Sequence, residues 1–142
     1  MKHSILYRIA AVLLILFALG HTLGFRQLQP EWGAGSVVAS MRSIHFNAQG
    51  FNRTYWDFYS GFGFFVSVFL LFAAVLSWQM SGLSSTTLAQ LRGPAWTLAL
   101  CFAALAVLSW LYFFVLPIIF TVALTLLFAT AAHLSGKTVE AR

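Results

Sequence analysis

Four long apolar segments constrain this chain more than any other feature of its sequence. They cover about residues 5–25, 55–80, 95–116 and 118–134, and a helix of about 20 residues can cross the hydrocarbon core of a bilayer. Only 8% of the residues are charged and 61% are hydrophobic, whereas soluble domains carry about 25% charged residues. We therefore predict an all-α fold, an integral membrane four-helix bundle that forms a single transmembrane domain over residues 1–142.

The first segment begins like a secretory signal peptide, with a short basic head and an apolar core. Its hydrophobicity continues past the small residue Gly20 as far as Phe25, so we expect a helix that is retained rather than cleaved. Gly20 and Gly24 also have the spacing that lets membrane helices approach each other closely.

The connections after the second and third segments are expected to be simple. Residues 80–94 are polar and predict a loop. Pro117 separates the third and fourth segments, and one continuous kinked helix there would be about 60 Å long, twice the hydrocarbon thickness. These two segments therefore predict a tight helical hairpin that turns at Pro117.

The connection over residues 26–54 is much longer than the roughly 2 to 8 residues usual in helical bundles. Part of it, about residues 36–46, has the pattern of a short amphipathic helix lying in the membrane interface or over the mouth of the bundle. Its apolar face would consist of Val37, Val38, Met41, Ile44 and His45.

Basic residues are distributed unevenly about the four segments. Five lie on the side shared by both termini and three on the other, namely Lys2, Arg8, Arg92, Lys137 and Arg142 against Arg26, Arg42 and Arg53. Because cytoplasmic loops carry an excess of lysine and arginine, we predict a multi-pass protein of the cell inner (plasma) membrane with both termini in the cytoplasm. The net charge of +5 forms no basic stripe, so no nucleic-acid partner is expected.

The second segment has two opposite faces on a helical wheel. One stripe begins with two charged residues and continues with residues that are small except for one leucine. It consists of Arg53, Asp57, Ser60, Gly63, Ser67, Leu70, Ala74 and Ser77. The other is aromatic and consists of Phe58, Phe62, Phe65, Phe69 and Phe72. Small residues let helices approach and bulky apolar ones suit lipid, so Asp57 is expected to point inward with the small stripe.

Asp57 is one of only three acidic residues, and an ionisable group this close to hydrocarbon indicates a functional site. His21 is expected at the same depth, in the outer quarter of the bilayer. We interpret His21 and Asp57 as an acid and base pair, because histidine titrates near neutrality. A ligand there would contact further side chains expected at this level, which are Arg53, Tyr59, Tyr55, Arg26, His45 and Trp56.

No metal or cofactor is predicted. The chain has no HExxH motif and no set of cysteines, and its single Cys101 excludes an intramolecular disulfide. His21 and His133 are expected roughly 20 to 25 Å apart in depth, too far to ligate one haem. A haem between His21 and His45 would place one of its ligands on the interfacial helix.

The same residues also have a purely structural interpretation. Thr54 and Asp57 have the spacing of a capping box, in which a carboxylate stabilises the start of a helix. Arg53 can contact headgroup phosphates, and His21 can hydrogen-bond to a neighbouring carbonyl.

Two motifs carry a family resemblance. The motif His21-Thr-Leu-Gly-Phe25 ends the first segment, and Arg53-Thr-Tyr-Trp-Asp-Phe-Tyr-Ser-Gly-Phe-Gly63 opens the second. Together they resemble a group of small, uncharacterised four-helix bacterial inner-membrane proteins. The resemblance covers roughly the first 80 residues in motif and the rest in hydropathy alone. It implies the fold and supplies no activity.

Three functions of different classes are compatible with these residues. The first is a non-catalytic membrane protein that binds a lipid or quinone-like molecule at an outer-leaflet site between the first two helices, or serves as an accessory subunit. The second is a membrane enzyme that uses His21 and Asp57 on a lipophilic substrate. The third is a small transporter, which would need to be a homodimer because four helices enclose little volume, and for which polar groups at mid-depth are few.

Overall fold

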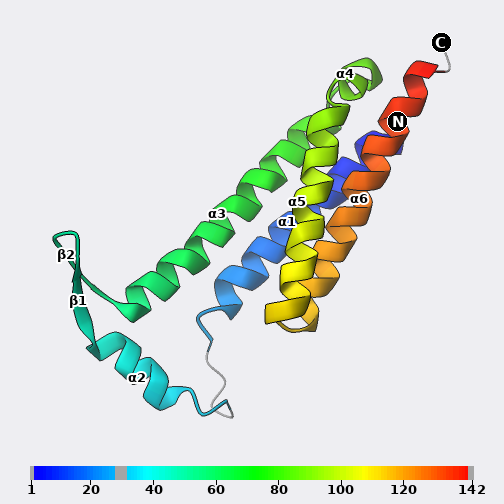
Figure 1. Ribbon diagram of the computed structural model, residues 1–142. Coiled ribbons are helices and arrows are strands. Elements are labelled where there is room, and N and C mark those ends of the chain that lie inside the picture. Colours follow the sequence, from blue (N-terminus) through cyan, green and yellow to red (C-terminus); the bar gives the residue numbers. More distant parts are fainter. Residues whose placement is uncertain (1, 28–31, 141–142) are drawn as a thin grey trace. The chain divides into compact units, whose positions relative to one another are not determined.

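The computed structural model describes residues 2–27 and 32–140, and it is almost entirely helical (Figure 1). The all-α prediction is confirmed. The elements in chain order are α1 (Lys2–Gly24), α2 (Gly35–Ser43), β1 (His45–Ala48), β2 (Phe51–Thr54), α3 (Tyr55–Ser81), α4 (Ser85–Gln90), α5 (Arg92–Tyr112) and α6 (Val115–Glu140).

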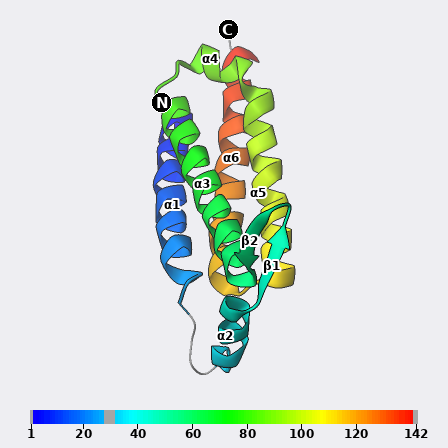
Figure 2. The same cartoon turned by 90° about the vertical axis from the view of Figure 1, so that its left-hand side faces the viewer.

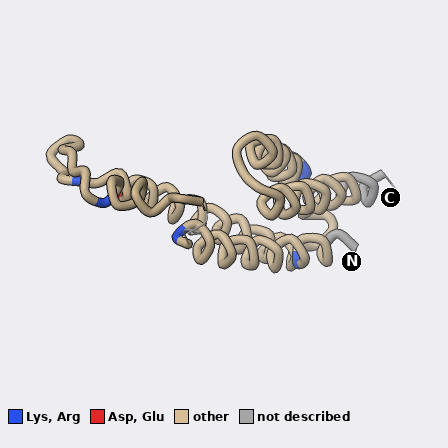
Figure 3. The backbone as a smooth tube through the Cα atoms, turned by 90° about the horizontal axis from the view of Figure 1, so that it is seen from below, with Lys and Arg blue, Asp and Glu red and all other residues tan. Residues whose placement is uncertain are grey.

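Four of these helices contain a stretch that is long and apolar enough to cross a membrane, as expected of a multi-pass membrane protein. The stretches are Ser4–Gly24, Tyr55–Ser81, Arg92–Tyr112 and Val115–Ser135. Figure 3 shows that most of each long helix carries no charged residue. Three of the basic residues used to predict orientation, Lys2, Lys137 and Arg142, have side chains outside the described set, so the orientation stays a prediction.

The contacts divide the chain into two compact units. One consists of Met1–Phe17 together with Leu70–Arg142, and the other is Ala18–Phe69. Helices α1 and α3 each contribute to both. The arrangement of all four spans as one bundle and one domain stays a prediction.

The first unit is built around α5 and α6, which run side by side in opposite directions (Figure 2). Aromatic rings join α1 to α6, since Phe17 stacks on Phe120 with centroids 4.9 Å apart and Tyr7 lies 6.3 Å from Phe128. Phe102 of α5 also contacts Phe128, at 5.5 Å. Alanines are buried among these rings and let the helix backbones approach, namely Ala10, Ala11, Ala95, Ala99, Ala131 and Ala132.

The turn between α5 and α6 comes earlier than the sequence suggested. Helix α5 ends at Tyr112, Phe113 is extended, and α6 begins at Val115, so Pro117 lies in the first turn of α6 rather than between the helices. Proline is tolerated there because the first N–H groups of a helix have no partner within it. The predicted boundaries near 116 and 118 are therefore wrong by a few residues.

The predicted polar loop over residues 80–94 contains a short helix, α4. Its N-cap is Ser84, whose hydroxyl accepts a hydrogen bond from the Thr87 N–H at 3.2 Å. The cap satisfies one of the free amides at the helix start, so a polar sequence can form a helical turn here. Leu88 anchors the turn, because its side chain is fully buried.

In the second unit the amphipathic helix is shorter than predicted. Helix α2 ends at Ser43, Ile44 is extended, and His45 opens strand β1 instead of continuing the helix. Of the apolar face expected for this helix, Val38 is buried, whereas Val37 and Ile44 are exposed. Its position in a membrane interface stays a prediction.

A β-hairpin that the sequence analysis did not anticipate follows α2. Strands β1 and β2 are antiparallel, with Ala48 opposite Phe51 at the turn (Figure 2). The two residues of the turn, Gln49 and Gly50, both have positive φ, 53° and 89°, as a type I′ hairpin turn requires. The side chain of Asn47 closes the turn by accepting a hydrogen bond from the Gly50 N–H at 2.7 Å.

The two faces predicted for α3 are confirmed below its first turn. Ser67, Leu70 and Ser77 of the small stripe are 6%, 2% and 0% exposed. On the aromatic stripe, Phe62 and Phe65 are 65% and 72% exposed. Helical periodicity therefore assigned the buried and exposed sides of this span correctly.

The hairpin turn gives a first testable prediction. Gly50→Ala should destabilise the hairpin by about 1 kcal/mol, because an L residue is strained at positive φ while its new Cβ would meet no other atom. Amide hydrogen exchange of residues 46–53 should accelerate about fivefold, whereas Gly35→Ala, in open space on α2, should leave these rates unchanged. Equal exchange in the two variants would contradict the assigned turn.

Candidate functional site

Asp57 and Thr54 form a capping box at the start of α3. The Thr54 N–H donates to the Asp57 carboxylate at 2.8 Å, and the Asp57 N–H donates to the Thr54 hydroxyl at 3.1 Å. Two amides that a helix start leaves unpaired are thereby satisfied. The predicted structural interpretation of Asp57 is confirmed.

The Asp57 side chain is exposed, so the prediction that it points inward is wrong. The small stripe becomes buried only further along α3. In the first turn, the Thr54 N–H has no partner within the helix and donates to the Asp57 carboxylate, which therefore lies at the exposed start of α3. Thr54 itself is buried at 8% exposure, which fixes the position of that partner.

His21 has a different partner, the backbone of α3. Its Nε2 atom lies 3.1 Å from the Gly63 carbonyl oxygen, which can only accept, so Nε2 carries the hydrogen. The ring also stacks on Phe25, with centroids 5.3 Å apart. Within the described residues His21 and Asp57 make no contact with each other, and their catalytic pairing stays a prediction.

His21 belongs to a series of hydrogen bonds between α1 and α3, which we call the α1–α3 clasp. The Thr22 hydroxyl donates to the Ser67 hydroxyl at 2.7 Å, and Ser67 donates in turn to the Gly63 carbonyl at 3.2 Å. Beyond the end of α1, the Tyr59 hydroxyl donates to the Phe25 carbonyl at 2.8 Å. Polar contacts of this kind between membrane helices contribute roughly 0.6 kcal/mol each.

Close packing accompanies the clasp at Gly63. A Cβ atom added to Gly63 would lie 2.6 Å from a ring carbon of Phe25, so only glycine leaves room for that ring. The glycines of the predicted close-approach motif behave differently. A Cβ at Gly20 or Gly24 would meet no atom within 4 Å.

The other predicted ligand residues lie around the hairpin and the first turns of α3. Arg42 stacks over Trp56 at 4.4 Å, and Arg26 lies 6.0 Å from the ring of Phe64. The remaining contacts are between Tyr55 and Phe46, between Trp56 and Tyr59, and between His45 and Asn52. These residues are held mainly by aromatic and cation–π contacts, and of this set the clasp includes only Tyr59.

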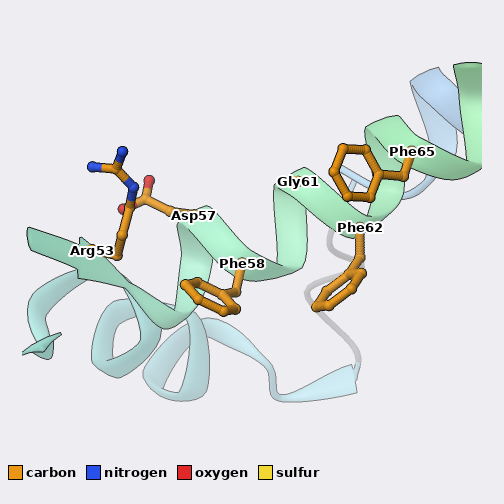
Figure 4. Close-up of a pocket in the computed structure, with 6 residues that line it drawn as sticks. All are labelled: Arg53, Asp57, Phe58, Gly61, Phe62 and Phe65. Atoms are coloured by element: carbon orange, nitrogen blue, oxygen red, sulfur yellow. The ribbon is translucent and has the colours of Figure 1, made fainter. Parts of the chain in front are cut away.

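An open groove of about 250 Å³ runs along α3 from the hairpin, and we call it the Gly61 groove. Its lining consists of Arg53, Asp57, Phe58, Gly61, Phe62 and Phe65 (Figure 4). The two charged side chains lie together at one end and the phenylalanines follow along the helix. Gly61 leaves the space open, since a Cβ there would meet no atom within 4 Å.

Three of the groove residues, the phenylalanines, belong to the stripe that the sequence predicts to face lipid, whereas no sequence pattern singled out Gly61. The available signal was the spacing of Asp57, Gly61 and Phe65 at i, i+4 and i+8, which places a residue without a side chain between a charge and a ring. A helical wheel reveals this open space only if Gly61 is counted as a position without a side chain.

Arg53 forms no salt bridge with Asp57 or with any other described carboxylate. Its Nη1 donates to the Asn52 carbonyl at 2.8 Å, and the guanidinium lies 5.2 Å from the ring of Phe51. In the described part of the chain Arg53 forms no ion pair, so most of its five N–H donors remain available.

Across residues 2–27 and 32–140 no cluster of three or more histidine, cysteine, aspartate or glutamate side chains could hold a metal ion. Comparison with protein-family models, curated proteins and solved structures found no match for this chain. The clasp and the Gly61 groove are therefore the features of this chain that bear on its function.

The capping box predicts a local cost for losing the Thr54 hydroxyl. Thr54→Ala should destabilise the start of α3 by about 1 kcal/mol, because the Asp57 N–H loses its acceptor. Thr54→Ser keeps a hydroxyl and should retain most of the stability. Thermal unfolding in one detergent, together with hydrogen exchange of the first turn of α3, would measure both, and equal behaviour of the two variants would contradict a stabilising cap.

The contact at Gly63 predicts a rescue. Gly63→Ala should destabilise the protein by about 1 to 3 kcal/mol, because the new methyl group displaces the Phe25 ring. Adding Phe25→Leu should recover part of this loss, as expected for residues in direct contact. Gly61→Ala, made in open space on the same helix, serves as the control and should not lower the melting temperature.

Proposed function

We propose that this chain is a non-catalytic integral membrane protein that binds a membrane phospholipid in the Gly61 groove. The observation that supports it is the guanidinium of Arg53, which forms no salt bridge, at one end of a groove whose other end is lined by phenylalanines. A guanidinium matches the oxygens of a phosphate, and the phenylalanine rings match an acyl chain.

The length of α3 supports a position at the boundary between headgroups and acyl chains. Its 27 residues extend about 40 Å, longer than the roughly 30 Å hydrocarbon core. Charged side chains are costly in hydrocarbon, so the end with Arg53 and Asp57 belongs in the headgroup layer. The phenylalanines that line the rest of the groove follow along α3, at the depth of the acyl chains.

The chemistry of Arg53 favours a phospholipid over the quinone-like ligand also considered. A quinone presents neutral carbonyl oxygens, whereas a phosphate presents the negative charge that a guanidinium binds most strongly. The enzyme alternative needs His21 and Asp57 to act on one substrate. His21 is instead hydrogen-bonded to Gly63 of α3, and Asp57 to Thr54 at the end of β2. In the predicted orientation both termini lie in the cytoplasm. The groove, at the start of α3, would then lie in the outer leaflet of the inner membrane.

A filled groove should no longer bind lipid. Gly61→Leu places a side chain in the open space above Gly61 and should reduce phospholipid retained through purification at least fivefold, as measured by mass spectrometry of the purified protein. Gly20→Leu is the matched control, because it also replaces a helical glycine in open space and gains the same roughly 1 kcal/mol of helix propensity. Equal lipid retention by the two variants would contradict the proposal.

A further inference from the structure

We infer that the phospholipid of the Gly61 groove has a zwitterionic headgroup with a primary ammonium, as in phosphatidylethanolamine. This inference rests on the proposed function and adds to it the chemical class of the headgroup. It follows from the presence of one positive and one negative side chain at the same end of the groove.

Arg53 and Asp57 lie together where the headgroup would be (Figure 4). They lie close enough for their charges to act on each other but form no salt bridge in the described structure, so each has hydrogen-bonding capacity left for a separate charge of a ligand. A headgroup with a phosphate and an ammonium supplies both partners. A headgroup whose only charge is its phosphate would satisfy Arg53, but it would bring that negative charge near Asp57 without a cation to offset it, which is unfavourable.

The capping box leaves part of the Asp57 carboxylate available. One oxygen, Oδ2, accepts the hydrogen bond from the Thr54 N–H, and the other, Oδ1, has no hydrogen-bond partner among the described residues. An ionised carboxylate accepts hydrogen bonds from several directions and donates none, so its ligand has to be a donor.

That requirement separates two zwitterionic headgroups. The primary ammonium of phosphatidylethanolamine carries three N–H donors that can reach Oδ1. The quaternary ammonium of phosphatidylcholine carries none, so it offers Asp57 its charge without a hydrogen bond. Charge-assisted hydrogen bonds are stronger than contacts between charges alone, so the ethanolamine headgroup should bind more tightly.

The phosphate is held by the other side chain of the pair. The hydrogen bond from Nη1 of Arg53 to the Asn52 carbonyl and the ring of Phe51 fix the orientation of the guanidinium. The remaining N–H groups can bind two phosphate oxygens at once.

The test compares three lipids with the same acyl chains. Delipidated protein in detergent would be titrated with phosphatidylethanolamine, phosphatidylglycerol and phosphatidylcholine, with bound lipid counted by native mass spectrometry. The wild type should bind phosphatidylethanolamine about threefold to fivefold more tightly than either of the others, a size typical of an exposed charge pair. Asp57→Asn should remove this preference, weakening phosphatidylethanolamine and strengthening phosphatidylglycerol.

A second variant separates the charge of Asp57 from its role in the helix cap. Asp57→Asn keeps a side-chain oxygen for the Thr54 N–H, whereas Thr54→Ala weakens the same cap and keeps the charge. The preference for phosphatidylethanolamine should survive in Thr54→Ala. Its loss in that variant would show that the cap, rather than the charge, sets the preference and would overturn the inference.

The remaining outcomes distinguish the inference from the proposed function. Phospholipid binding that Gly61→Leu abolishes, but that is equally tight for phosphatidylethanolamine and either other lipid, overturns the inference and leaves the proposed function standing. An unchanged preference in Asp57→Asn does the same. Binding of all three lipids that does not respond to Gly61→Leu overturns both.

Discussion

The need to pair every backbone N–H and C=O group inside hydrocarbon governs this structure. No water is present there to satisfy them, so the spanning segments are helices and the non-helical backbone is confined to their ends. The start of α3 shows how the transition is made. The strand β2 ends at Thr54, and the capping box with Asp57 supplies partners for the amides that the new helix cannot pair within itself.

Side-chain hydroxyls within the spans meet the same constraint in two ways. Most of them return to the carbonyl four residues earlier in their own helix, as Ser77 does to Ala73 and Ser135 does to Ala131, at 2.8 Å. In the α1–α3 clasp, Ser67 likewise donates to the carbonyl of Gly63, four residues earlier, and it also accepts a hydrogen bond from Thr22 of α1. Since lipid is as apolar as leucine, such polar links and the close fit at Gly63 supply the specific attraction between helices that the hydrophobic effect cannot.

The sequence was most informative where one periodic signal dominated. Four apolar segments predicted the four spanning helices, and the small and aromatic stripes predicted which side of α3 is buried. It was least informative where short-range chemistry decides the path of the chain. The hairpin depends on positive φ at Gln49 and Gly50, and glutamine is not among the residues that usually indicate this turn.

For the candidate site, the residue types were easier to predict than their partners. His21, Asp57 and Arg53 were recognised as unusual near hydrocarbon, and His21 was also expected to bond a carbonyl, which it does at Gly63. Depth along the membrane placed His21 and Asp57 at one level, and the small stripe of the helical wheel predicted that Asp57 points inward, which is wrong for the first turn of α3. The first turn of α3 directs Asp57 toward Thr54, and Phe25 occupies the space beside Gly63.

Asp57 illustrates how a structural role and a binding role can share one side chain. A capping carboxylate needs only one oxygen for its amide, and a position in the first turn of a spanning helix holds the other near the headgroup layer. The helix start therefore positions an acceptor without any element dedicated to binding. Gly61, one turn further along, completes the arrangement by leaving the helix surface open between that acceptor and the phenylalanines. Along α3 the polar cap at Asp57 is followed by the open space at Gly61 and then by exposed phenylalanine rings. This order matches that of a phospholipid, from its polar headgroup to its apolar acyl chain.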